Sequence, residues 1–266
     1  MEVLGFLASI AIGISLGLIG GGGSILTVPI LVYLFGVDPV IATGYSLFVV
    51  GLTSGIGTYS YLKNGLVNLK TALVFGIPSL VAVYISRAFV VPAIPNEILT
   101  IGHWVLAKGQ FMMLAFALLM LAASSRMIKK DNTAAEEENQ KMGQLNYPLI
   151  VFAGFLEGSF TGLVGAGGGF LIIPILVLLC KLPMKVAVGT SLLIISVKSL
   201  IGFTGNLGQY PMDWMLLLKV SAFAIVGILI GTSLSKKIEG KKLKPAFGWF
   251  VLVMAIYILV KELLTL

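Results

Sequence analysis

Residues 13–29 read GISLGLIGGGGSILTVP, and residues 158–174 read GSFTGLVGAGGGFLIIP. Each segment lies within an apolar stretch, 3–37 or 147–182, that is too long for one membrane-spanning helix of about 20 residues. Each glycine destabilises a helix by about 1 kcal/mol relative to alanine, so consecutive glycines break it. We therefore expect each stretch to form two arms that meet at a glycine tip.

The two segments are copies of each other at a constant offset of 145 residues, as from Gly13 to Gly158. Gly13, Gly17, Gly20, Gly22, Gly23, Leu26 and Pro29 align with Gly158, Gly162, Gly165, Gly167, Gly168, Leu171 and Pro174. The alignment continues without a gap, pairing Ala42, Gly44, Ser46, Leu47 and Gly57 with Ala187, Gly189, Ser191, Leu192 and Gly202. So many ordered matches indicate an internal duplication. The expected division is an N-terminal repeat at 1–124, a charged linker at 125–146 and a C-terminal repeat at 147–266.

The composition is that of a polytopic membrane protein. Of the 266 residues, 58% are hydrophobic and 11% are charged, with a mean hydropathy of +1.05, whereas soluble domains have about 25% charged residues. This excludes a cytosolic enzyme. The net charge of +7 comes from Lys and Arg at the ends of apolar segments, so it indicates membrane orientation and no nucleic acid. With a single cysteine (Cys180) and a single histidine (His103), no metal and no cofactor are expected.

Basic residues decide how often the chain crosses the membrane. Six segments have the length of simple spans: 40–62, 69–91, 101–124, 185–205, 213–234 and 246–264. If the two broken stretches also cross, thirteen loop Lys and Arg residues divide six against seven, whereas re-entrant hairpins bring all thirteen to one side. The positive-inside rule favours hairpins and places linker 125–146 and loop 235–245 in the cytoplasm. A tilted, unwound crossing helix stays an alternative.

Three spans in each repeat is an odd number, so the second repeat enters the membrane from the opposite side. The predicted fold class is an all-α polytopic integral membrane protein with two inverted repeats, each a glycine-broken re-entrant helical hairpin plus three transmembrane helices. The two tips are expected to approach each other near the midplane. Non-helical backbone persists at that depth only where it lines a cavity or is buried in protein, so the tips mark the pathway.

The tips are therefore the predicted substrate site. Glycine lets a ligand approach the backbone, and the helices expected to begin near Ser24 and Phe170 offer free N–H groups that favour an anion. The tip residues are Gly20, Gly21, Gly22, Gly23, Ser24, Gly165, Ala166, Gly167, Gly168 and Gly169. Helix packing is the competing role of glycine, and it is expected at the closely spaced pairs Gly13 and Gly17, Gly158 and Gly162, and Gly227 and Gly231.

The helix after each hairpin adds polar groups to the predicted site. Thr43 and Ser46 open the first of these helices, and Thr190 and Ser191 open the second. Lys198 lies on the same helical face as Ser191, thirteen residues into an apolar span. An intramembrane charge is costly and marks a functional site or a paired charge. Lys198 could bind an anion or pair with Glu157, and Glu157 could instead be a protonatable coupling residue.

Other polar residues are assigned to the ends of spans. Asn206, Gln209, Tyr59 and Tyr61 are expected to be interfacial rather than ligand-binding. Arg87, Lys108, Lys219 and Lys261 are counted as charges near span ends, on the face opposite the thirteen loop cations.

Catalytic motifs are absent. Residues 13–17 fit the pattern G-x-S-x-G, but a nucleophile elbow requires a strand-turn-helix setting. The glycine tips lack the Lys and Ser/Thr of a phosphate-binding P-loop. We therefore expect no enzyme activity.

The duplicated motif resembles that of the TauE/SafE family of membrane permeases. It consists of the glycine break, an apolar arm ending in proline and an A-x-G-x-S-L helix, at Gly13–Pro29 with Ala42–Leu47 and at Gly158–Pro174 with Ala187–Leu192. The resemblance spans nearly the whole chain. It implies export of small sulfur oxoanions or organosulfonates, such as sulfite or sulfoacetate, across the bacterial inner membrane.

The sequence thus predicts a secondary transporter that exports a small anion by alternating access. Its expected partners are that anion and the lipid bilayer, with a homo-oligomer left open. The alternatives are a proton-coupled importer that uses Glu157, a membrane scaffold without transport activity, and, least favoured, an intramembrane enzyme.

Overall fold

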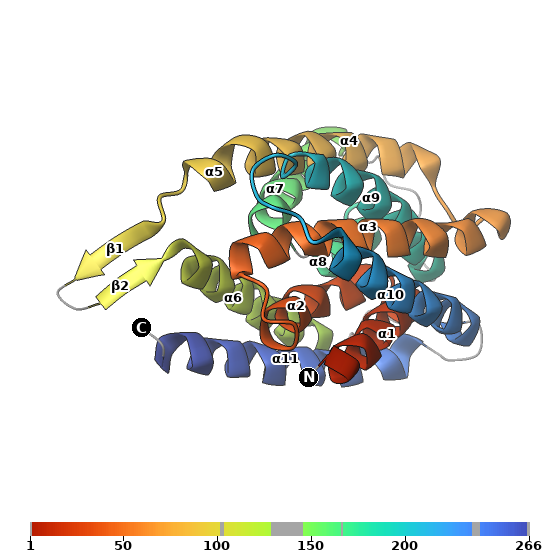
Figure 1. The fold of residues 1–266 in the computed structure, drawn as a ribbon. Helices are drawn as coiled ribbons and strands as arrows, with labels where there is room; N and C mark the ends of the chain where they lie inside the picture. Colours follow the sequence, from red (N-terminus) through yellow and green to blue (C-terminus); the bar gives the residue numbers. More distant parts are fainter. Residues whose placement is uncertain (1, 102–103, 129–145, 166, 236–239, 265–266) are drawn as a thin grey trace.

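The computed structural model describes residues 2–101, 104–128, 146–165, 167–235 and 240–264 as a bundle of helices with one β-hairpin at its side (Figure 1). The first half contains α1 (Glu2–Ile19), the 3₁₀ helix η1 (Gly21–Leu26), α2 (Thr27–Tyr33), α3 (Pro39–Lys63), α4 (Leu69–Ile85), the π-helix η2 (Ser86–Val90), α5 (Val91–Ala93), β1 (Glu97–Ile101), β2 (Trp104–Ala107) and α6 (Lys108–Ile128). The second half contains α7 (Tyr147–Val164), α8 (Gly169–Leu178), α9 (Met184–Thr204), α10 (Trp214–Ser235) and α11 (Gly240–Leu264).

Five helical segments of the described chain are long and apolar enough to cross a membrane. They are Pro39–Lys63, Leu69–Ala93, Tyr147–Val164, Met184–Thr204 and Trp214–Ser235. Four of them match predicted spans, and the fifth, α7, matches a stretch that the sequence assigned to a hairpin arm. The protein is therefore a multi-pass membrane protein, as its composition predicts.

The predicted span at 101–124 is wrong at its beginning, where two short strands precede the helix in an otherwise mostly helical protein. β1 and β2 pair antiparallel, with Thr100 opposite Val105 and Ile101 opposite Trp104, and α6 begins only at Lys108. β-branched and aromatic residues favour strands, and hydropathy alone does not separate such a strand from the start of an apolar helix. The hairpin projects away from the helices (Figure 1).

Both predicted helix breaks are confirmed. α1 ends at Ile19 and α7 ends at Val164. Gly20 follows the first helix with φ of 72°, and Gly165 follows the second with φ of 75°, a left-handed backbone that glycine adopts without steric cost. The helix expected near Ser24 begins later, because a 3₁₀ turn covers Gly21–Leu26 before α2. α8 begins at Gly169, one residue from the expected Phe170.

The packing role of the spaced glycines is confirmed. A Cβ atom on Gly13 would overlap the Ala224 carbonyl of α10, and one on Gly158 would overlap the Ser79 carbonyl of α4. Only glycine permits such close backbone contact between helices. The two contacts are equivalent at the 145-residue offset, because Gly13 corresponds to Gly158 and Ser79 to Ala224. The α1–α10 pair and the α7–α4 pair thus repeat one packing arrangement.

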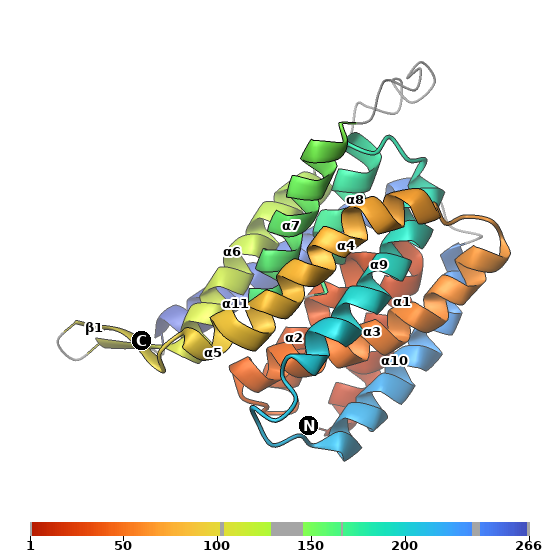
Figure 2. The ribbon, with the colours of Figure 1, turned by 90° about the horizontal axis from the view of Figure 1, so that it is seen from above.

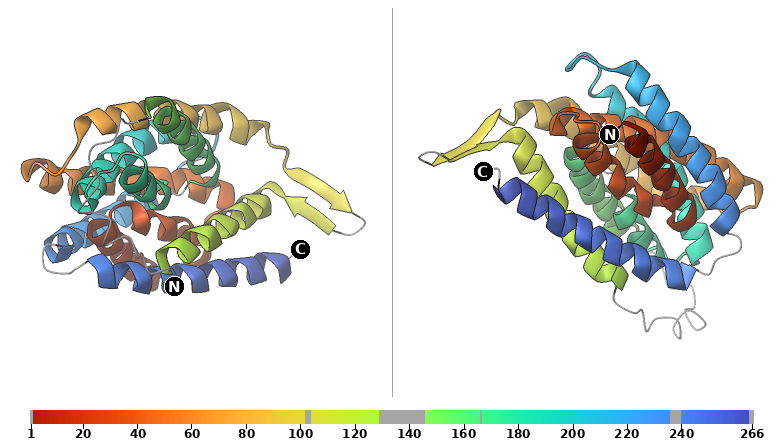
Figure 3. Two further views of the ribbon diagram at one scale, coloured as in Figure 1. Left: turned by 180° about the vertical axis from the view of Figure 1, so that it is seen from behind. Right: turned by 60° about the horizontal axis from the view of Figure 1, so that its bottom comes forward.

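α3 and α9, which are also repeat equivalents, run antiparallel to each other through the centre (Figure 2). A Cβ on Gly51 would lie 2.8 Å from Leu200 Cγ, and one on Gly55 would lie 2.9 Å from Ser196 Oγ. The residue number of the contact in α9 falls as the residue number of the glycine in α3 rises, so the two helices run in opposite directions. Figure 3 shows α6 and α11 side by side along another face of the bundle.

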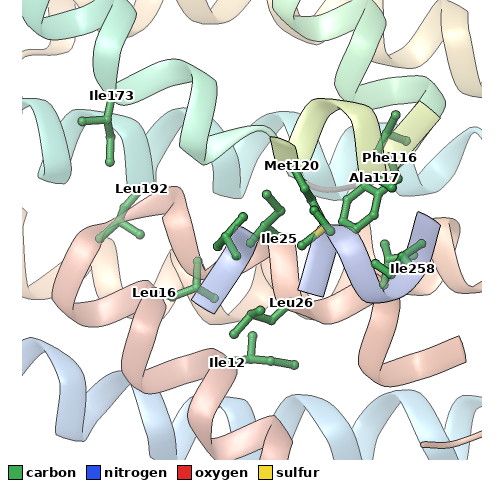
Figure 4. Packing of buried hydrophobic residues seen from close by; sticks show 14 of the residues in the cluster. Ile12, Leu16, Ile25, Leu26, Phe116, Ala117, Met120, Ile173, Leu192 and Ile258 are labelled. Atoms are coloured by element: carbon green, nitrogen blue, oxygen red, sulfur yellow. The ribbon is translucent and has the colours of Figure 1, made fainter. Parts of the chain in front are cut away.

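The largest core cluster joins both halves around the broken segments. Figure 4 shows Ile12 and Leu16 of α1 near Ile25 and Leu26 of η1, with Met120, Phe116 and Ile258 beyond them. Ile173 of α8 and Leu192 of α9 belong to the same cluster. The non-helical backbone after α1 is therefore covered by apolar side chains, as a break at membrane depth requires.

Candidate functional site

The two glycine tips meet inside the protein. A Cβ atom added to Gly21 would overlap the Cα of Gly169, and one added to Gly169 would overlap the Cα of Gly21. η1 and α8 are in contact over this region. The predicted approach of the two tips is therefore observed, as a direct contact between their backbones.

Each tip also contacts the polar helix of the other half. Gly165, at the second tip, lies against the backbone and side chain of Thr43 at the start of α3. Gly20, at the first tip, lies against α9, where a Cβ would be 3.2 Å from Ser191 Oγ. Thr43 and Ser191 are both buried. The structure thus brings two of the four predicted hydroxyl residues to the tips.

The other predicted hydroxyl groups have different surroundings. Thr190 Oγ1 accepts a 2.9 Å hydrogen bond from the Asn68 N–H at the start of α4, so it ties α9 to the α3–α4 turn. Ser46 is buried, and its Oγ has no hydrogen-bond partner among the described residues. Ser24 Oγ donates to the Gly21 carbonyl at 2.7 Å, within the tip itself.

The remaining tip glycines pack against protein. Gly23 lies on Ser15 and Leu16 of α1, and Gly167 lies near Val50 and Ser24. Gly22 is part of η1, and Ala166 lies outside the described residues. The tip backbone is therefore enclosed by its neighbours in this conformation.

Lys198 and Glu157 form a buried ion pair at the second tip. Their side chains are each 1% exposed. Glu157 Oε2 also accepts a 2.6 Å hydrogen bond from Ser79 Oγ, and Lys198 Nζ donates to Thr161 Oγ1 at 3.3 Å. Gly168 lies directly on both charged groups, because a Cβ there would overlap them. Of the two roles predicted for Lys198, the ion pair is the one observed, and Glu157 offsets its charge.

The position expected for Arg87 is wrong, and Lys108, from the same group, is also buried. Arg87 was counted with the charges near span ends, but it lies in the π-helix η2 and is 0% exposed. Arg87 Nη1 donates a 2.9 Å hydrogen bond to Thr43 Oγ1. Its Nε and Nη2 have no hydrogen-bond partner, and no Asp or Glu pairs with it, among the described residues. Arg87 therefore contacts the second tip indirectly, through Thr43, whereas Lys198 contacts this tip directly.

The loop after α9 supplies two further polar residues, Asn206 and Gln209, and for Asn206 the sequence expectation is wrong. Asn206 is only 2% exposed rather than interfacial, and its Nδ2 has no partner in the described part of the chain. It lies against Gly44, where a Cβ would be 3.1 Å from Nδ2. Gln209 Nε2 donates to the Arg87 carbonyl at 3.4 Å and to the Gly205 carbonyl at 2.6 Å. Asn206 is therefore buried, whereas Gln209 is half-buried.

Tyr61 makes a contact in one half of the chain that corresponds to the contact of Asn206 in the other half. It is buried against Gly189, and its hydroxyl lies 3.4 Å from Ser235 Oγ. Tyr59, by contrast, is exposed as expected. At the 145-residue offset, Gly44 corresponds to Gly189 and Tyr61 to Asn206, so the same glycine contact holds a tyrosine in one half and an asparagine in the other.

The site can offer hydrogen-bond donors and positive charge. Within the described residues, no group of three or more His, Cys, Asp or Glu side chains could hold a metal ion. Thr43 Oγ1 accepts from Arg87 and donates to the Val40 carbonyl at 2.6 Å, so its one O–H is already used. The hydroxyl of Ser46, the amide of Asn206 and the Arg87 guanidinium are the groups that suit an oxyanion.

Broken apolar segments that meet around buried polar groups define a membrane transporter. The chain belongs to the family described as Sulfite exporter TauE/SafE, whose profile matches residues 5–258. It is 31% identical to a "Probable membrane transporter protein" of Xylella fastidiosa over 93% of this chain and 91% of that protein. It is also 30% identical to the "Probable membrane transporter protein YunE" of Bacillus subtilis, over 90% and 91% of the two chains. No solved structure matches this chain.

Proposed function

We propose that this protein is a secondary transporter that exports a small anion, a sulfur oxoanion or organosulfonate, by alternating access across the bacterial inner membrane. The observation that carries the proposal is the contact of the two glycine tips at Gly21 and Gly169, with hydroxyl and cationic groups beside them. Paired helix interruptions at equivalent positions are typical of transporter substrate sites. The sulfur oxoanion follows from the description of the family.

The proposed architecture is a pair of inverted repeats, 1–124 and 147–266, joined by a cytoplasmic linker, with a re-entrant hairpin in each. The packing between the halves supports this architecture, because the contact of Gly13 in α1 with α10 is repeated by the contact of Gly158 in α7 with α4. The antiparallel course of α3 and α9 supports inversion, because equivalent helices of inverted repeats cross in opposite directions. Alternating access then requires one set of helices to move against the other around the tips.

Export of an anion is favoured by the membrane potential. Moving one negative charge out of a negative interior gains about 2.3 kcal/mol per 100 mV. Export against a modest gradient therefore needs no coupling ion. The backbone N–H groups of the tips, the hydroxyl of Ser46 and a cation would replace the hydration of the anion during passage.

The second candidate is a proton-coupled anion importer, which the buried Glu157 favours. A carboxylate beside Lys198 could take up a proton when the pair separates. Uptake that rises as the outside pH falls in the wild type, and loses this dependence in Glu157→Gln, would support the importer. Loss of transport in Glu157→Gln with wild-type rates independent of pH would assign Glu157 to structure instead.

The deciding experiment uses the purified full chain in proteoliposomes. Sulfite, sulfoacetate, sulfate and acetate are loaded inside, with taurine as a zwitterion of zero net charge, and efflux is followed under an imposed potential. We expect sulfite or sulfoacetate to leave faster than from empty liposomes, and faster when the receiving side is positive. No efflux or uptake of any probe would favour the scaffold role.

A further inference from the structure

Arg87 is a buried charge with no Asp or Glu partner in the described part of the chain, and this distinguishes it from Lys198. Lys198 and Glu157 neutralise each other, with further hydrogen bonds to Ser79 and Thr161. Arg87 has one hydrogen bond from its guanidinium, to Thr43. A buried cation without a counter-ion is strongly unfavourable. Such a group persists where a ligand supplies the missing charge.

The unused nitrogens of Arg87 form one edge of its guanidinium. Nη1 donates to Thr43, whereas Nε and Nη2, which lie on the same side of the planar group, have no partner among the residues described. Two parallel N–H donors on one edge match two oxygens of a carboxylate, sulfonate or sulfite group. A lysine has no such edge. The free donors therefore have the geometry of a bidentate oxyanion site.

The surroundings of Arg87 are also suited to an anion. Asn206, with its unpartnered Nδ2, and Gln209 belong to the loop whose Gly205 packs on the Arg87 side chain, where a Cβ would lie 3.0 Å from Arg87 Cβ. Among the described residues, Arg87 Nε and Nη2 and Asn206 Nδ2 are buried donors without a partner, and Gln209 Oε1 is a buried acceptor without one. The region therefore has more unpaired donors than unpaired acceptors.

The local backbone is unusual at this position. Arg87 lies in η2, a π-helical segment between α4 and α5. Such segments are rare and occur frequently at functional sites. The wider π-helical turn points the Arg87 side chain in a different direction from that of a continuous α-helix. The side chain is buried and does not extend to the end of the span.

We propose that Arg87 binds the transported oxyanion through Nε and Nη2, with Asn206 Nδ2 as a further donor, while Thr43 holds the guanidinium against the second tip. The ligand class is a small anion that presents at least two oxygens on one centre. This inference rests on the proposed transport function and names the group that recognises its substrate. Lys198 then serves the structure of the tip, and not the charge of the substrate.

The test is anion binding to the purified full-length protein in detergent, by isothermal titration calorimetry with sulfite, sulfoacetate, methanesulfonate and acetate. The variants are Arg87→Lys, Arg87→Met and Asn206→Ala, with Lys219→Met as a control for an exposed cation of α10. A hydrogen bond to a charged group contributes enough to change affinity by about 10- to 100-fold. We expect a loss in this range for Arg87→Lys, no measurable binding for Arg87→Met, a smaller loss for Asn206→Ala, and a change of less than about twofold for Lys219→Met.

A second measurement separates binding from a structural role. Removal of an unpaired buried charge should leave the thermal midpoint of the anion-free protein unchanged or raise it, so Arg87→Met should melt no earlier than wild type while losing the upward shift caused by the anion. Anion binding by Arg87→Met at wild-type affinity would overturn the proposal. Failure of Arg87→Met to fold, with wild-type affinity in Arg87→Lys, would overturn it as well.

The outcomes also separate this inference from the proposed function. A wild-type protein that binds and transports none of the probes refutes the transport function, and the role of Arg87 with it. A wild-type protein that transports sulfite or a sulfonate equally well without Arg87 refutes only the role of Arg87. Selectivity between methanesulfonate and acetate, which differ in their acidic group, reports which oxyanion the site recognises.

Discussion

The Glu157–Lys198 pair gives a quantitative prediction for stability. Both side chains are buried, and Glu157 accepts hydrogen bonds from Lys198 and from Ser79. Glu157→Gln keeps the shape of the side chain but leaves Lys198 charged and unpaired. Breaking a buried pair from one side costs about 3–5 kcal/mol. At about 2–4 °C per kcal/mol for a chain of this size, the thermal midpoint should fall by about 6–20 °C.

The matched control is the double variant Glu157→Gln/Lys198→Met, which removes both charges. Replacement of a whole buried pair by groups of similar size is often neutral, so the double variant should melt within a few degrees of wild type. The assay is thermal unfolding in detergent followed by the fluorescence of the three tryptophans. A Glu157→Gln protein that melts like wild type, or a double variant that melts as early as the single one, would refute the assignment of a buried pair.

Three further predictions follow from the glycines and the repeat. Gly21→Ala should lower the thermal midpoint and abolish transport, because its Cβ would overlap Gly169. The control Gly76→Ala should be neutral or stabilise α4 by about 1 kcal/mol, because its Cβ would meet nothing closer than Ile194 Cγ1 at 3.5 Å. Equal effects of the two substitutions on the melting curve would contradict the tip contact. Gly158→Ala should destabilise the protein by about 1–3 kcal/mol, since its Cβ would overlap the Ser79 carbonyl and separate α4 from α7; an unchanged midpoint would rule out this close approach. Asp38→Cys and Pro183→Cys, in a Cys180→Ala background, should be labelled from opposite faces of the membrane by a thiol reagent that does not cross it, and labelling from the same face would refute the inverted hairpins.

Much of the fold could be predicted because consecutive glycines break a helix locally, whatever lies next to them in the fold. The ends of α1 at Ile19 and of α7 at Val164 follow from consecutive glycines that no helix tolerates. The contact between the tips was predictable from the duplication, because inverted repeats, as proposed here, would bring equivalent breaks together. The spaced glycines were also correctly assigned to packing, since Gly13 and Gly158 contact carbonyl groups of the neighbouring helix.

The site was less accessible to sequence reasoning, because burial depends on neighbours. Lys198 was recognised as buried from its place in the middle of a span, and Glu157 was named as one partner. Arg87 lies four residues from the end of its predicted span, 69–91, where a long side chain normally reaches the interface. Its inward position depends on the π-helix of η2 and on the loop containing Asn206, and neither has a clear sequence signature. The sequence feature that could have indicated an unpaired charge is the absence of any Asp or Glu in the apolar run around Arg87.

The charges of the site are not duplicated, although the scaffold is. At the 145-residue offset, Arg87 corresponds to Thr232, Lys198 to Thr53 and Glu157 to Ile12. In a transporter of inverted repeats, exchanging the conformations of the two halves converts the inward-open state into the outward-open state, so identical halves would populate both states equally. Unequal charges remove that equality, and a difference of about 1.4 kcal/mol is enough for a tenfold preference. Under the proposed alternating-access mechanism, the placement of these three charged side chains would therefore bias which side of the membrane the empty transporter faces at rest.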